Sequence, residues 1–304
     1  MISKPKTHRV SSSLPAPANR QNLPGLTAAR SIVKRFWIHT VAWGITAAFL
    51  LPFFWVFITS LRQVGLPPPN TIEWWPTQPH WHNYSQLFQI LPITRYLVNS
   101  LLVIALALPI TWLVASLAGF SLSQLPRLWR RRWLIISLAL LMVPGSAVWI
   151  FRFRIYQWLN FLDTVWALVL PAFAASNPLF VLLFYWTFRR IPNELFEAAR
   201  LEGASAWTTW WQIACPPARP TSIAIIVLTF VMYWSDFISP ILYIYQPANY
   251  TLPVGLQILK QLDPTNWPYL MAGSVLMTLP IVFLFIILQR FFLHDFSLSR
   301  STEQ

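Results

Sequence analysis

The sequence predicts an all-α integral membrane protein, built from six transmembrane helices with a cytoplasmic loop of two short helices between the fourth and the fifth. Composition is the first reason: 56% of the 304 residues are hydrophobic and only 10% are charged, whereas a soluble domain carries about 25% charged residues. The mean hydropathy of +0.51 is the second reason. The third reason is that several uncharged stretches reach the roughly 20 residues that a helix needs to cross a bilayer.

Six apolar segments are the predicted membrane spans, and five of them lie between consecutive charged residues. The span that comes fifth along the chain is the exception. It is uncharged from Pro220 to Ser235 and again from Phe237 to Leu259, so one helix is predicted to continue to about Tyr243 with Asp236 near its far end. The spans are predicted at about residues 36–61, 96–124, 133–153, 165–189, 217–243 and 266–290, within a membrane domain that covers residues 34–296.

The basic residues predict the orientation of the chain, because cytoplasmic loops of membrane proteins accumulate Lys and Arg. With the N-terminus in the cytoplasm, 17 of the 22 Lys and Arg residues lie on the cytoplasmic side and 5 on the outer side. Both termini are therefore expected in the cytoplasm. The net charge is +13, but its spread over separate loops argues against nucleic-acid binding, which needs one basic patch.

The two ends of the chain are predicted to be tails. Residues 1–33 are rich in Ser, Pro, Ala and Arg, and they lack both a helical apolar pattern and the apolar core of a signal peptide. This composition favours a disordered, basic cytoplasmic tail. Residues 297–304 are expected to form a short C-terminal tail.

Motifs for metal or nucleotide chemistry are absent from the sequence. The single cysteine, Cys215, excludes an internal disulfide and a multi-cysteine metal site, and the five histidines form no HExxH pair. None of the four lysines follows a glycine, so there is no GxxxxGK[ST] phosphate loop. We therefore expect neither a metal site nor a nucleotide site in this chain.

The longest cytoplasmic connection, residues 190–216, is predicted to hold two short helices outside the membrane. Pro192 and Asn193 supply a helix start, and acidic residues follow in the first turns, where the helix dipole favours negative charge. Gly203 is the predicted stop, because a C-terminal glycine allows a left-handed turn. Ser205 then caps a second helix that runs to about Gln212 and is ended by two prolines.

This connection also carries a spaced motif. Glu197-Ala198-Ala199 is followed after three residues by Gly203 and, after nine more, by Ile213-Ala214-Cys215-Pro216. The pattern resembles the EAA loop of binding-protein-dependent ABC import permeases. Cys215 stands where leucine is usual, and Glu202 replaces the usual aspartate while keeping its charge.

Further matches resemble the carbohydrate branch of this family, in particular the smaller permease subunit of maltose-type transporters, and extend over about Phe36 to Phe296. They are Asn83-Tyr84, Asn99-Ser100, Pro192 with Glu194-Leu195, Trp234-Ser235-Asp236-Phe237 with Pro240, Thr251 to Leu256, and Gln289-Arg290. The family's glycine-rich C-terminal end is absent, and His294 to Arg300 take its place.

The resemblance implies a non-catalytic transport subunit in a bacterial inner membrane, surrounded by lipid, that imports a carbohydrate or polyol. The implied partners are a second homologous permease, two ATP-binding cassette subunits that bind ATP and Mg²⁺, and an extracytoplasmic solute-binding protein. The Glu197 helix is expected to seat in a groove on the ATPase, so that closure on ATP switches the pathway. The residues assigned to this coupling are Glu194, Leu195, Phe196, Glu197, Ala198, Ala199, Glu202, Gly203, Ala204, Ile213 and Pro216.

The spans offer amide, hydroxyl and aromatic groups but almost no charge, which favours a neutral, hydroxyl-rich solute, because an ion would lose its hydration without compensation. The candidate path residues are Asn99, Ser100, Tyr233, Trp234, Ser235 and Asp236. Three alternatives stay open. One is an ABC permease for another small solute. The second is an ion-coupled secondary transporter, which usually has buried ionisable residues and internal repeats. The third, a membrane-embedded enzyme, would need clustered His, Asp, Glu or Cys at membrane depth.

Overall fold

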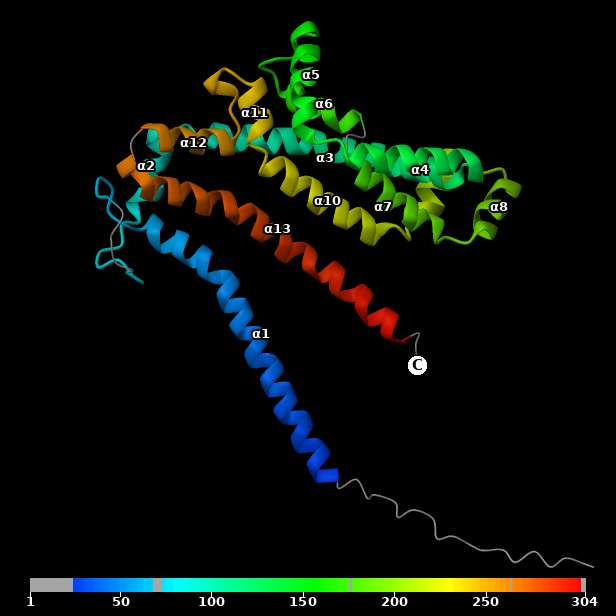
Figure 1. The fold of residues 1–304 in the computed structure, drawn as a ribbon, viewed down its shortest axis with the longest axis horizontal. Coiled ribbons are helices and arrows are strands. Elements are labelled where there is room, and N and C mark those ends of the chain that lie inside the picture. The colour runs from blue at the N-terminus through cyan, green and yellow to red at the C-terminus, as the bar shows by residue number, and fades with distance from the viewer. Residues whose placement is uncertain (1–23, 68–72, 175–176, 263, 302–304) are drawn as a thin grey trace, which may run out of the picture. The chain divides into compact units, whose positions relative to one another are not determined.

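The computed structural model describes residues 24–67, 73–174, 177–262 and 264–301, and all regular structure within these ranges is helical. The helices are drawn in Figure 1. Their bounds are α1 Pro24–Ser60, α2 His82–Ile90, α3 Ile93–Gln124, α4 Arg127–Leu141, α5 Gly145–Trp158, α6 Val165–Phe173, α7 Pro178–Arg189, α8 Asn193–Leu201, α9 Ala206–Thr208, η1 Thr209–Ala214, α10 Arg219–Trp234, α11 Ile238–Tyr243, η2 Pro247–Asn249, α12 Leu252–Leu262, η3 Pro264–Asn266 and α13 Trp267–Ser301.

The chain divides into two compact units, Met1–Phe53 and Phe54–Gln304. The described part of the first unit belongs to α1, whose large apolar side chains are exposed, for example Trp43 at 74% and Phe49 at 74%. A helix that is apolar on every side is typical of a membrane span. The helix begins at Pro24, inside the segment that composition predicted to be disordered, and residues 1–23 of that predicted tail lie outside the described residues.

Four helical segments in the described chain are long and apolar enough to cross a membrane: Arg35–Ser60, Ile93–Gln124, Val165–Arg189 and Trp267–Gln289. Two further candidates are bent pairs. α4 and α5 meet at 93°, and the Ala206–Ala214 segment meets α10 at 92°. Counting each bent pair as one span gives up to six. Pro144 precedes α5 and Pro216 precedes α10, and a proline inside a helix interrupts its hydrogen bonds and bends or ends it.

The helix predicted over residues 217–243 is not continuous. α10 ends at Trp234, and a separate helix, α11, begins at Ile238. The Asp236 carboxylate accepts a hydrogen bond from the backbone N–H of Ser239 at 3.0 Å. Phe237 is the N-cap of α11, and Asp236, one residue earlier, pairs an N–H of the first turn that has no partner within the helix. The prediction of one continuous helix over residues 217–243 is therefore wrong.

The last span also differs from its predicted end. α13 continues to Ser301, through most of the segment predicted to be a C-terminal tail. Residues 302–304 lie outside the described residues.

α3 is the helix around which the second unit packs, since it contacts α6, α7, α10 and α12. It approaches α7 closely at Gly119. A Cβ atom at this position would stand 2.6 Å from the Cβ of Phe184 and 2.9 Å from the backbone nitrogen of Tyr185. The two helices can therefore approach this closely only because residue 119 has no side chain.

Three groups of buried apolar side chains hold the second unit together. One contains Leu87, Tyr96, Trp234 and Leu252, and a second contains Val103, Tyr156, Ala167 and Tyr243. The third, which we call the Phe120 cluster, joins α3, α7, α8, η1 and α10. Its members are Ala115, Phe120, Phe180, Val181, Phe184, Phe188, Ile191, Phe196, Trp210, Ala214, Ala218 and Ile225.

Candidate functional site

The candidate site is the connection between α7 and α10, and its first element is α8. The helix begins at Asn193, directly after Pro192, as predicted. Glu194 lies in its first turn and Arg200 in its last, so both charges complement the helix dipole. Pro192 before the first turn has no backbone N–H to leave unpaired. The local sequence thus determines where this short helix starts.

Gly203 ends α8 in the left-handed conformation, with φ of +77°. The Gly203 N–H donates to the Arg200 carbonyl at 3.1 Å, and the Ala204 N–H donates to the Ala199 carbonyl at 2.9 Å. These two bonds form a Schellman motif, which satisfies the last carbonyls of the helix. A Cβ at position 203 would meet no atom within 4 Å, so the requirement for glycine is conformational and not steric.

The second predicted short helix is present in a different form. The Ser205 hydroxyl accepts a hydrogen bond from the Thr208 N–H at 3.1 Å, which confirms Ser205 as its cap. Only Ala206–Thr208 is α-helical, and the chain then widens into the π-helix η1, Thr209–Ala214. A π-helical turn is rare, and its hydrogen bonds span five residues instead of four. The spacing of apolar residues in so short a segment does not distinguish a π-helix from an α-helix.

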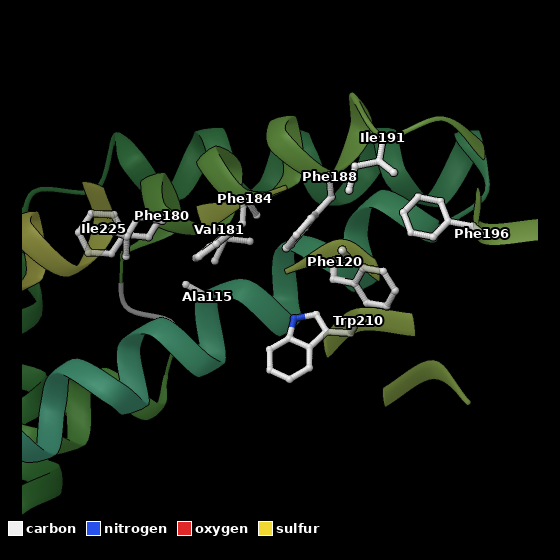
Figure 2. Packing of buried hydrophobic residues seen from close by; sticks show 12 residues of the cluster. Ala115, Phe120, Phe180, Val181, Phe184, Phe188, Ile191, Phe196, Trp210 and Ile225 are labelled. Atoms are coloured by element: carbon white, nitrogen blue, oxygen red, sulfur yellow. The ribbon is translucent and has the colours of Figure 1, made fainter. Parts of the chain in front are cut away.

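One face of α8 is buried in the Phe120 cluster, as Figure 2 shows for Phe196, Phe120, Phe188 and Trp210. Phe196 is only 3% exposed, and its ring centre lies 6.1 Å from that of Phe120. The Phe120 ring in turn meets Phe188 of α7 edge to face at 5.8 Å. Aromatic contacts of this kind stabilise beyond the area they bury. α8 is therefore anchored to α3 directly and to α7 through Phe120.

A polar contact adds to this anchor. The Arg200 guanidinium donates to the side-chain oxygen of Gln124, the last residue of α3, at 3.1 Å. Together with the buried ring of Phe196, this bond connects α8 to α3 at two points. A displacement of α8 would therefore be passed to α3.

The other face of α8 is exposed, so the predicted coupling residues are divided between a buried and an exposed side of the helix. Phe196 and Ala199 are buried in the chain's own core, so they do not lie on the surface that a partner protein would meet. Ala204 and Ile213 are half-buried. The predicted residues that remain exposed are Glu194, Leu195, Glu197, Ala198, Glu202, Gly203 and Pro216.

The sequence prediction missed Leu201, which is 90% exposed at the end of α8. Leu195, Ala198 and Leu201 are spaced three residues apart, which places them along one side of the helix. That spacing is the signal that was available in the sequence. Trp207, 58% exposed just beyond the turn, is a second large apolar side chain on the same connection.

A cavity of about 530 Å³ lies where η1 meets α3 and α10. Its lining residues are Trp112, Trp211, Gln212, Cys215, Pro216, Arg219, Ser222 and Ile226. The Trp112 ring lies 5.9 Å from that of Trp210 and 6.3 Å from that of Trp211, so tryptophans form one wall. Cys215 lies in the connection between η1 and α10, and burial raises the pKa of its thiol to about 11.

Three of the predicted path residues form structural bonds. The Asn99 amide donates to the carbonyls of Ala248 at 2.9 Å and Tyr250 at 3.0 Å, and the Ser100 hydroxyl accepts from the Leu252 N–H at 2.9 Å. These bonds tie α3 to the segment that precedes α12.

The third residue is Trp234, which is fully buried and donates to the Met277 carbonyl at 2.8 Å. Of the other path candidates, Tyr233 and Asp236 are half-buried and Ser235 is exposed.

In the described ranges, no three His, Cys, Asp or Glu side chains are grouped closely enough to hold a metal ion.

Known proteins are similar to this chain in architecture and in sequence. The family model "Binding-protein-dependent transport system inner membrane component" matches residues 85–297. The chain is 30% identical over 240 residues to the sulfoquinovosyl glycerol transport system permease protein SmoH of Agrobacterium fabrum, covering 79% of this chain and 84% of that protein. It is 26% identical over 267 residues to the trehalose/maltose transport system permease protein MalG of Thermococcus litoralis, covering 86% and 94%.

A solved structure has the same fold. The crystal structure of a bacterial ABC transporter involved in the import of the acidic polysaccharide alginate superposes with a TM-score of 0.72 at 19% identity, covering 86% of this chain and 98% of that one. The family model covers well over half of the chain, and this coverage establishes the family to which the chain belongs. The chain belongs to the binding-protein-dependent ABC import permeases and is a non-catalytic membrane component of a transport system.

Proposed function

We propose that this chain is one of two permease subunits of an ATP-driven importer for a neutral carbohydrate or polyol, with both termini in the cytoplasm. The observation that carries the proposal is the two-sided character of α8. One face is anchored in the Phe120 cluster through Phe196, and the other exposes Leu195, Ala198 and Leu201 beside acidic side chains. An exposed amphipathic helix of this kind suits a groove on a partner protein.

The proposed mechanism is a rigid-body transfer of motion. Two ATPase subunits close on ATP and Mg²⁺ and move α8, with Glu197 as a charged anchor and the Leu195 side as the apolar contact. Because Phe196 packs on Phe120 and Arg200 bonds Gln124, α3 and α7 move with α8. Rotation of these helices opens the pathway to the opposite side of the membrane, as in other switches built on packed elements.

The proposed partners are a homologous second permease, two ATP-binding cassette subunits and an extracytoplasmic binding protein. The sequence has no phosphate loop, so ATP needs a partner. A related alginate ABC transporter has been solved in complex with a pentasaccharide-bound periplasmic protein. Copurification from native membranes is the test: we expect a second permease to accompany this chain, and recovery of the chain with no such partner would contradict the proposal.

The distribution of charge supports a neutral solute. Among the residues whose burial the structure describes (35–67, 73–174, 177–261 and 265–289), Arg62 is the one buried charged residue, and its guanidinium lies 3.5 Å from the Glu73 carboxylate. Arg62 lies outside the helices. The helical residues of described burial therefore hold no buried charge that could compensate an ion for the loss of its water. The same observation disfavours ion-coupled transport, which relies on buried ionisable groups.

An acidic saccharide is the second candidate, because the names of two relatives point to it. SmoH belongs to a system for sulfoquinovosyl glycerol, and the solved transporter is involved in the import of the acidic polysaccharide alginate. Uptake by the reconstituted complex distinguishes the two candidates. We expect ATP-dependent uptake of neutral saccharides or polyols that persists when ionophores collapse ion gradients. Preferential uptake of alginate oligosaccharides would support the second candidate instead.

A further inference from the structure

A group of arginines and tryptophans at the start of α4 plays no part in the coupling loop or in the path candidates. We call it the α4 basic cluster; it consists of Arg127, Trp129, Arg130, Arg131, Arg132 and Trp133. Arg130 is half-buried and the other five side chains are exposed, with Trp129 at 52% and Trp133 at 51%. Four positive charges thus lie within six consecutive residues on the surface of the chain.

These charges have no acidic neighbour in the sequence and no ion-pair partner in the described part of the chain. The sequence from residue 74 to residue 162 contains no Asp or Glu. Within the described ranges the one ion pair joins Arg62 to Glu73, so the α4 basic cluster takes part in none. Arg130 makes a long hydrogen bond of 3.4 Å to the Leu125 carbonyl, and the Arg132 guanidinium lies 5.1 Å from the centre of the Trp129 ring. No ion pair among the described residues therefore neutralises these four charges.

The rest of α4 is mostly apolar and uncovered. No residue of the helix is buried, and its half-buried positions Arg130, Leu134 and Ser137 lie on one side, at the spacing of a packed helical face. α4 packs on α7. The other sides expose large apolar side chains, among them Ile135 at 56% and Leu138 at 50%. The arginines and tryptophans thus alternate in the first two turns of α4, and exposed aliphatic side chains follow them along the same helix.

From this order we propose that the α4 basic cluster binds an anionic phospholipid. The arginines hold the phosphate, because a guanidinium donates paired hydrogen bonds that match phosphate oxygens. The tryptophans lie at the level of the headgroup. The acyl chains cover the exposed aliphatic side chains of α4. Basic residues at the cytoplasmic end of a membrane helix are a recognised pattern for anionic lipids. Free phosphate would use the arginines alone and leave the apolar face uncovered.

The position of the cluster gives the lipid a role. Gln124, whose side chain accepts the bond from Arg200 of α8, is separated from Arg127 by only two residues. A lipid bound at the start of α4 therefore holds the corner between α3 and α4, next to the point where α8 is anchored. This inference rests on the proposed orientation, which places the start of α4 on the cytoplasmic side, and it does not depend on which solute is imported.

The test is lipid retention by the purified full chain, counted by native mass spectrometry during titration with phosphatidylglycerol or phosphatidylcholine. We expect the wild-type chain to retain phosphatidylglycerol in preference. The double variant Arg131→Gln/Arg132→Gln should bind it at least about tenfold more weakly, since each basic residue near an anionic membrane surface contributes a factor of about five. Raised salt should weaken the binding as well, because the attraction is screened.

The matched control is Arg95→Gln/Arg154→Gln, which removes two exposed arginines elsewhere and should leave retention unchanged. Arg131→Lys/Arg132→Lys keeps the charge and should restore most of the binding. Equal retention of both lipids, an equal loss in the control variant, or displacement by inorganic phosphate at the lipid's concentration would each overturn the proposal. All four exchanged positions are exposed, so the variants are expected to fold.

Discussion

The Arg200 guanidinium and the side-chain oxygen of Gln124 are 3.1 Å apart, although 76 residues separate them in the chain. This bond holds α8 against the C-terminal end of α3. Together with the ring of Phe196 on Phe120, it makes α8 a part of the membrane unit and not a loosely attached loop. The first predictions test that connection.

Phe196 and Leu195 are neighbours in the sequence, but one side chain is buried and the other is exposed, so their substitution should have different effects. Phe196→Ala removes a ring that is 3% exposed and should lower the free energy of unfolding by about 3 kcal/mol. Leu195→Ala changes a side chain that is 52% exposed, so the chain's own stability should stay within about 0.5 kcal/mol of wild type while the ATPase subunits bind less tightly. Thermal unfolding in detergent and ATPase copurification measure the two effects. Equal destabilisation by both variants would contradict the assigned faces of α8.

Gly203 should tolerate few substitutions. Gly203→Val forces a β-branched residue to a φ of +77°, at a cost of about 1 kcal/mol or more. The turn after α8 then changes direction, so we expect uptake to fail while the binding protein still holds its solute. Gly203→Asn is the milder comparison, because Asn adopts this conformation more readily. Normal, ATP-coupled uptake by a normally inserted Gly203→Val variant would refute a role for this turn.

Gly119 should be required for the packing of α3 on α7. Gly119→Ala places a methyl group 2.6 Å from the Cβ of Phe184, so the helices must separate, and we expect a loss of about 1–3 kcal/mol. Gly145→Ala is the matched control, since a Cβ there meets nothing within 4 Å. Unfolding in detergent should distinguish the two variants. Similar stabilities would mean that α3 and α7 do not approach as described.

Asn99 should act as a structural residue. Asn99→Ala leaves the Ala248 and Tyr250 carbonyls without their amide partner, at an expected cost of about 1–3 kcal/mol. Ser235→Ala serves as the control, because the Ser235 hydroxyl is exposed and bonds its own helix at Val231. Protein stability should fall only in the first variant. A change in solute preference without loss of stability would contradict a structural role and support the prediction that Asn99 lies on the solute path.

Cys215 is a reporter for the cavity beside η1. Its thiol pKa is raised from the ordinary value of 9.0 to about 11, so the thiolate at pH 7 is about a hundredfold scarcer than in an ordinary thiol. Maleimide labelling, which needs the thiolate, should be slow at pH 7 and should accelerate as the pH rises toward 11. The comparison is Leu201→Cys in a Cys215→Ser background, since position 201 is 90% exposed. Equal labelling rates at pH 7 would show that Cys215 is not enclosed.

Some features of the site depend on neighbours in the sequence, and these could be predicted. Pro192 starts α8, Gly203 ends it in the left-handed conformation, and Ser205 caps the next turn, as expected. Each follows from the conformations and hydrogen bonds available to a few consecutive residues. The apolar stretches likewise predicted a helical membrane protein, because hydrophobic length is a property of the sequence alone.

The tertiary structure decided which side of each helix is covered and where long helices break. The motif suggests Phe196 as a contact residue, but its ring is buried against Phe120 of α3, which in turn meets Phe188 of α7. α3 lies far from α7 and α8 in the sequence. The sequence alone suggests that a solute could reach Asn99, Ser100 and Trp234. In the folded chain these side chains bond instead to the backbone near the start of α12 and within α13. Such bonds depend on approach in three dimensions, and no spacing along the chain encodes that approach.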